Sequence, residues 1–142
     1  MLFRLNKELE AQYKKSGMDF SSPKNEIEYK SKLILADIPA DMQITRKQAA
    51  IISHEYLLKI LGEEDEKDIS KALILKDLYD CRVCVKHIAQ VYIKGIIKPH
   101  ISEGDAKNHS LPVIFGGNEV VAETEIEAII ERIFNKDKRS KN

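Results

Sequence analysis

Two cysteines and a histidine form the arrangement in this 142-residue sequence that is best suited to chemistry. Cys81 and Cys84 are separated by two residues, and His87 follows three residues later. Thiolates and imidazoles bind zinc, and a CxxC pair at the start of a helix suits a dithiol redox site because the helix dipole lowers the thiol pKa. A zinc site would need a fourth ligand, for which His100 and His109 are candidates.

The same three residues also have a structural interpretation. Cysteine is among the most readily buried residues, and Cys84 lies on the apolar face of the helix predicted around it. The spacing matches no standard zinc module, no strand–helix–strand pattern precedes the motif, and the charge of Asp80 opposes thiolate formation at Cys81. We therefore expect packing, with neither a cofactor nor an enzymatic activity. Cys81, Cys84 and His87 stay as an alternative metal or redox site.

Other polar pairs are weaker candidates for chemistry. Glu123 and Glu125 are two residues apart, so on a helix their carboxylates diverge and cannot share a substrate. Gly116-Gly117 is interpreted as a turn, because the glutamates that follow would repel a phosphate. His54 and Glu55 fall on a mixed face of their predicted helix, where we expect them to be solvated.

Apolar residues at helical spacing predict the elements that position these side chains. The pattern indicates a mainly α, compact bundle of about six helices with at most short strand fragments, such as 112–115. The predicted helices span about 2–15, 23–36, 45–61, 69–75, 81–94 and 122–135, and the fourth is only a turn or two. Ser22, Thr45 and Asp80 are the expected N-caps of the second, third and fifth helices.

Composition excludes several classes of function. The 23 basic and 23 acidic residues cancel, which argues against a nucleic-acid binder of the usual basic kind. No apolar run reaches the roughly 18 residues of a membrane span, and the charged N-terminus does not resemble a secretory signal. As written, the chain is expected in the cytoplasm. It would reach the cell surface if it is a fragment of an exported protein.

A weak internal repeat links two distant parts of the chain. A shift of 77 residues places 38–52 over 115–129. Each segment has an apolar anchor, a small or turn-forming pair, an Asp or Asn, and an apolar residue just before the predicted helix. The similarity is one of pattern, with almost no identity.

This pattern resembles the S-layer homology module of bacterial cell surfaces. The resemblance covers residues 35–61 and 77–134, about one and a half repeats. The matching positions are Ile44-Thr45-Arg46-Lys47-Gln48, Ile88, Val91, Gly95-Ile96-Ile97, Phe115, Asn118 and Glu125.

The resemblance implies a helical repeat fold that binds cell-wall polysaccharide, with the signature arginine contacting the glycan. In that family, three modules usually form a pseudo-threefold spindle. This chain departs from the pattern at Glu123, where the second arginine should be, at Gln48 and at Gly116-Gly117, and it has no tryptophan to stack on a sugar. Arg46 is therefore the one family position carried over as a ligand-binding residue.

These observations favour one domain over 1–142, with N-terminal helices (1–34), a partial repeat (35–61), a repeat (77–134) and a flexible tail (136–142). The leading hypothesis is a non-catalytic binding or assembly module whose partner is a cell-wall glycan. The alternatives are a cytoplasmic protein–protein interaction domain and a CxxC redox or zinc-binding protein. The sequence does not determine the oligomeric state.

Overall fold

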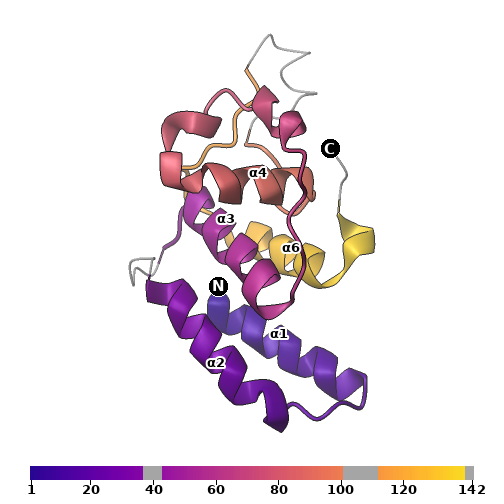
Figure 1. Cartoon of the computed structure of the whole chain (residues 1–142). Coiled ribbons are helices and arrows are strands. Elements are labelled where there is room, and N and C mark those ends of the chain that lie inside the picture. The colour runs from indigo at the N-terminus through magenta and orange to yellow at the C-terminus, as the bar shows by residue number, and fades with distance from the viewer. Residues whose placement is uncertain (37–42, 101–111, 140–142) are drawn as a thin grey trace.

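The computed structural model describes residues 1–36, 43–100 and 112–139, and its architecture is mainly α, as predicted (Figure 1). Within the described residues the backbone forms α-helices and short helical turns, and no β-sheet. The elements are α1 (Leu2–Lys15), α2 (Ser21–Ala36), α3 (Arg46–Glu55), α4 (Val85–Ile93) and α6 (Glu123–Phe134), a π-helical turn (Tyr56–Ile60), and 3₁₀ turns at Ser70–Ile74, Leu78–Asp80, Arg82–Cys84 and Lys136–Lys138.

The centre of the molecule is the crossing of α3 and α4, the pair of helices in most extensive contact (Figure 1). Six consecutive residues of α4, His87 to Tyr92, are buried. One face of α4 meets α3, and the 3₁₀ turns of residues 70–84 also pack against it. Residues 87–92 have no solvent face, so this part of α4 serves as a core element rather than an amphipathic surface helix.

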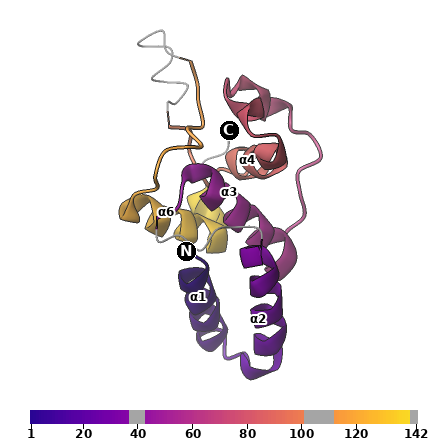
Figure 2. The same cartoon turned by 90° about the vertical axis from the view of Figure 1, so that its left-hand side faces the viewer.

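Helices α1 and α2 form an antiparallel hairpin at one end of the molecule (Figure 2). The predicted stripe of α1 faces inward, with Leu2, Leu5 and Leu9 buried. Helix α2 packs against the π-helical turn that extends α3. In that turn the Tyr56 hydroxyl donates a hydrogen bond to Oδ1 of Asn6, 3.1 Å away, and so ties the hairpin to the centre.

The two segments matched by the 77-residue shift enter their helices in the same register and lie side by side. Helix α3 begins at Arg46 and α6 at Glu123, 77 residues later, and each follows an extended N-cap residue. The φ and ψ angles are −86° and 165° at Thr45 and −75° and 153° at Ala122. Thr45 also forms an isolated antiparallel bridge with Val120. The turn that precedes Thr45 in the proposed repeat falls outside the described residues.

The capping predictions hold in part. Thr45 caps α3 through a capping box with Gln48, as expected. Helix α2 begins at Ser21 rather than beyond Ser22. Its first backbone N–H, that of Ser21, donates to Oδ1 of Asp19 at 3.0 Å.

The predicted helix over 81–94 is wrong at its start. Cys81 has an extended backbone and separates two 3₁₀ turns, Leu78–Asp80 and Arg82–Cys84. Asp80 therefore caps no helix. Helix α4 starts only at Val85, and it ends, as predicted, before Gly95, which has a positive φ of 72°.

None of the described helices combines the length and apolarity that crossing a bilayer requires.

Candidate functional site

Arg46 lies in the core, where it joins three segments of the chain. Its side chain is only 5% exposed. The Nε–H donates to the Phe115 carbonyl oxygen at 2.9 Å, Nη1 is ion-paired with Glu125 of α6, and Nη2 donates to the Lys98 carbonyl oxygen. The guanidinium also stacks over the Phe115 ring, 5.2 Å from its centroid. We call Arg46 a structural hub, because all three nitrogens of its guanidinium group bind partners within the protein.

The Phe115 carbonyl that Arg46 binds is held in place by Asp77, which no motif in the sequence marks as a functional residue. The two carboxylate oxygens of Asp77 accept from the backbone N–H groups of Phe115 and Gly116, each at 2.8 Å. Gly116 has a φ of +75°, and a Cβ there would lie 2.6 Å from Cβ of His100. Only glycine fits this position, so the Gly116-Gly117 turn has a packing reason as well as a conformational one.

A hollow of about 330 Å³ opens beside the buried Arg46. Lys98 and His100 border it from one side, and Thr124, Glu125 and Arg132 border it from α6. Three cationic side chains, Arg46, Lys98 and Arg132, line the hollow together with one carboxylate, Glu125. The Glu125 carboxylate is already paired with Arg46. The rim is therefore net positive.

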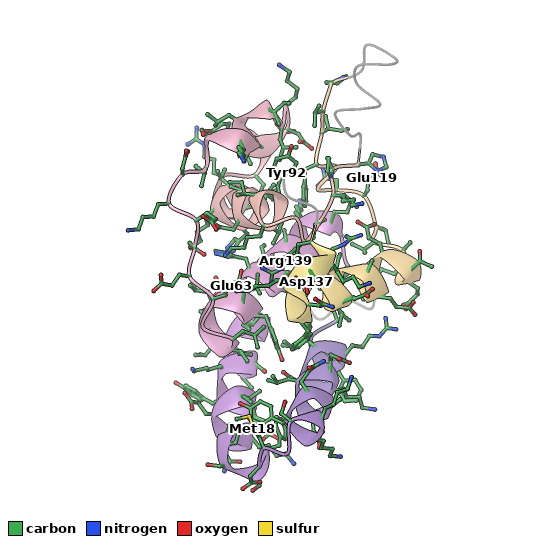
Figure 3. All side chains as sticks on the ribbon, turned by 90° about the vertical axis from the view of Figure 1, so that its right-hand side faces the viewer. Met18, Glu63, Tyr92, Glu119, Asp137 and Arg139 are labelled. Atoms are coloured by element: carbon green, nitrogen blue, oxygen red, sulfur yellow. A yellow bond between two sulfur atoms is a disulfide. The ribbon has the colours of Figure 1, made fainter. Side chains whose placement is uncertain are left out.

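A larger hollow, of about 820 Å³, lies between the loop after α3 and the segment that follows α6. Three of the charged side chains that line it, Glu63, Lys94 and Arg139, are paired with one another. Glu63 accepts from Lys94 at 2.8 Å and forms a two-pronged ion pair with Arg139 at 3.0 Å for each contact. Figure 3 shows Glu63 and Arg139 facing each other. Burial alone would raise the pKa of Glu63, but the hydrogen bonds and charges of Arg139 and Lys94 outweigh it and lower the pKa. This network is a structural clamp.

Cys81 and Cys84 are bonded to each other as a disulfide in this structure. Cys84 is buried, and Cys81 borders a small hollow together with Asp77 and Asp80. Neither sulfur is then a free thiolate. The close polar partner of His87 belongs to a different helix, and the group of side chains around His87 that could hold a metal ion contains neither cysteine.

That partner is His54 of α3, and the expectation that His54 and Glu55 are solvated is wrong. The exposed fraction is 2% for His54 and 6% for His87. Their Nδ1 atoms lie 2.8 Å apart, and Nε2 of His54 lies 2.6 Å from Oδ1 of Asp65. Burial, and next the neighbouring His54, lower the pKa of His87 to about 4. At neutral pH His87 is therefore uncharged.

Glu55 completes this group from the helix position next to His54. Its Oε1 lies 3.9 Å from Nδ1 of His87, and its Oε2 is ion-paired with Lys59 at 2.6 Å. Burial acts to raise the pKa of Glu55, but the hydrogen bond and charge of Lys59, with smaller contributions from the two histidines, lower it overall. A carboxylate and two imidazoles thus meet in the interior.

The remaining candidates are dispersed. Glu123 and Glu125 diverge as predicted, since Glu123 pairs with Arg4 of α1 at 2.8 Å while Glu125 pairs with Arg46. His100 packs at the Gly116 turn. His109 lies outside the described residues.

Comparison with models of protein families, with characterised proteins and with solved structures finds no match for this chain.

Proposed function

We propose that this chain is a non-catalytic binding module of the S-layer homology kind, and that its ligand is a cell-wall polysaccharide. One observation carries the proposal. The two segments that the 77-residue shift relates begin their helices in the same register and pair with each other, as two copies of one building block would.

The pairing of these segments is more extensive than a single bridge. The Arg46 N–H donates to the Glu119 carbonyl at 2.8 Å, and the Lys47 N–H donates to the Gly117 carbonyl at 3.0 Å. In the reverse direction, the Val121 N–H donates to the carbonyl oxygen just before Thr45, also at 3.0 Å. Backbone hydrogen bonds in both directions fix the two helix entries relative to each other.

The ligand site in this proposal is the hollow beside the paired entries. Its rim offers exposed polar side chains, Lys98, His100 and Thr124, that are free of the core network built around Arg46. The positive rim favours a glycan that carries acidic groups, because oppositely charged partners attract. Arg46 acts here by holding the walls of the hollow together and contacts the sugar at most at its edge.

Binding to purified cell-wall sacculi tests the proposal. Lys98→Ala removes a rim cation, and Ala128→Phe fills the hollow from α6, so both are expected to weaken retention at least about tenfold. Ala11→Phe adds the same ring on the exposed side of α1 and is the matched control, with retention unchanged. A wild-type chain that sacculi do not retain would eliminate the glycan.

A protein partner is the second candidate, favoured by the 3₁₀ turns around the disulfide. This short stretch of chain exposes large apolar side chains, which is typical of a contact surface. They are Leu73, Ile74, Tyr79 and Val83, with exposed fractions of 55%, 39%, 64% and 77%. Light scattering coupled to size-exclusion chromatography tests self-association directly. In that assay a Tyr79→Ser, Val83→Ser variant should lower the mass, and a wild-type chain that is monomeric at high concentration would exclude a homomeric role.

A further inference from the structure

We propose that His54, His87 and Glu55 form a zinc site that is independent of the glycan-binding role. Histidine, cysteine and carboxylate side chains are the usual metal ligands. Among the described residues, these three form the group of such side chains that lies close enough together to hold one ion. One ligand atom from each lies within 4.8 Å of the other two. Two imidazole nitrogens and one carboxylate oxygen suit zinc, and they leave a fourth position open for water.

The hydrogen bonds fix which nitrogen faces the metal position. With Nε2–H donating to Asp65, the neutral imidazole of His54 has its lone pair on Nδ1, the atom that lies next to Nδ1 of His87. A metal-binding histidine usually donates its other ring N–H to a carboxylate, which orients the ring and increases its basicity. His54 already has this arrangement without any ion.

In that tautomer of His54, the 2.8 Å contact between the two Nδ1 atoms is a hydrogen bond that His87 donates to His54. Zinc would replace that hydrogen, and His87 would change tautomer, carrying its proton on Nε2 instead of Nδ1. The number of protons on each ring is unchanged. Two nitrogens on one tetrahedral zinc ion lie about 3.3 Å apart, so the present 2.8 Å separation must widen by roughly 0.5 Å.

Asp65 is held at the right place by the residues on either side of it. Gln90 of α4 accepts from the Glu66 N–H and donates to the Glu66 carbonyl, both at 2.9 Å. On the other side, Lys94 donates to the Glu64 carbonyl at 2.6 Å. Helix α4, which supplies His87, therefore also clamps the loop that supplies Asp65. Such a clamp positions an outer carboxylate without placing it in contact with the metal.

The local charges balance around a divalent ion, with one exception. Glu55 and Asp65 supply two negative charges against the two positive charges of zinc, and histidines bind a metal ion as neutral ligands. Lys59 opposes the ion, because its Nζ is 2.6 Å from the Glu55 carboxylate. Its side chain is 38% exposed, so it has room to turn toward solvent, and its removal should strengthen metal binding.

The backbone beside this cluster is unusual. Immediately after Glu55, helix α3 widens into the π-helical turn Tyr56–Ile60. Such turns are rare and occur frequently at functional sites.

Calorimetric titration of the full, chelator-treated chain with Zn²⁺ tests the site, and Co²⁺ serves as a visible-absorption probe of its geometry. We expect one ion per chain and a tetrahedral Co²⁺ spectrum. His54→Gln, His87→Gln and Glu55→Gln should each weaken binding more than about 100-fold, beyond what loss of an outer partner causes. The paired substitution Cys81→Ser, Cys84→Ser is the control, and it should leave the stoichiometry and the affinity unchanged.

Two exposed positions give a readout that does not depend on the buried variants folding. Asp65→Asn should weaken binding about 10- to 100-fold while the tetrahedral Co²⁺ spectrum persists. Lys59→Met should tighten binding several-fold, since it removes a nearby positive charge. A wild-type chain that takes up no zinc would overturn the proposal. So would binding that is lost in the cysteine control, or binding that neither the Asp65 nor the Lys59 variant alters.

Discussion

Replacing Arg46 should destabilise the fold far more than it alters any surface. Arg46→Ala leaves the Glu125 carboxylate, whose side chain is only 27% exposed, without its ion-pair partner, and it removes the guanidinium donor from the Phe115 and Lys98 carbonyls. Removing one member of a buried ion pair costs about 3–5 kcal/mol. That is a large share of the roughly 5–15 kcal/mol by which domains are stable.

The expected loss is measurable by urea denaturation followed by far-ultraviolet circular dichroism, since the chain has no tryptophan to report by fluorescence. In a chain of this size each kcal/mol shifts the melting temperature by about 2–4 °C, so Arg46→Ala should lower it by roughly 6–20 °C. Arg46→Lys keeps the charge but loses the planar fork, and should recover only part of the loss.

A double-mutant cycle separates the ion pair from the rest of the network. Arg46→Ala and Glu125→Ala should be non-additive by about 1–3 kcal/mol, because each removes the partner of the other. Additive effects, or a loss below about 1 kcal/mol for Arg46→Ala alone, would refute the assignment of Arg46 as a structural hub. Either result would instead favour the role that the family resemblance implies for Arg46, a direct contact with the glycan.

Three further outcomes follow from the structure. Asp77→Ala should cost about 2 kcal/mol, because it removes the charged acceptor of two backbone N–H groups, and Asp77→Asn should cost less; urea denaturation measures both. The lowered pKa of Glu63 contributes stability that is fully present above the unfolded-state pKa and is lost as the pH falls through the folded-state pKa. In Glu63→Gln the melting temperature should therefore fall less steeply as the pH is lowered. Breaking the Cys81–Cys84 disulfide should cost at most about 2 kcal/mol, because the loop it closes is short, and a larger loss on adding reductant would contradict this.

The sequence predicted the helices better than their contacts. The inward stripes of α1 and α6 are evident from spacing, because a residue's place on a helix follows from periodicity alone. The start of α4 was misplaced because the disulfide between Cys81 and Cys84 accompanies two short 3₁₀ turns, where periodicity predicts one continuous helix.

The spacing that points to His87 predicts the wrong partner for it. His87 follows Cys84 by three residues, yet its partner His54 lies 33 residues earlier, on helix α3, which crosses α4. Periodicity shows which way a residue points, but not what faces it. No sequence pattern distinguishes Asp65 or Asp77 from other carboxylates, because only tertiary packing gives each its specific acceptor role.

The burial of α4 has a consequence for how freely its sequence can vary. Helix α6 buries Ile126, Ile129 and Ile133, so a saturation library should show tolerance rising and falling with each helical turn. Over residues 87–92 of α4 this periodic variation in tolerance should be absent, because every side chain there is buried. Substitutions there would be rejected in an unbroken block, and a histidine and a glutamine would be constrained as tightly as the aliphatic residues between them.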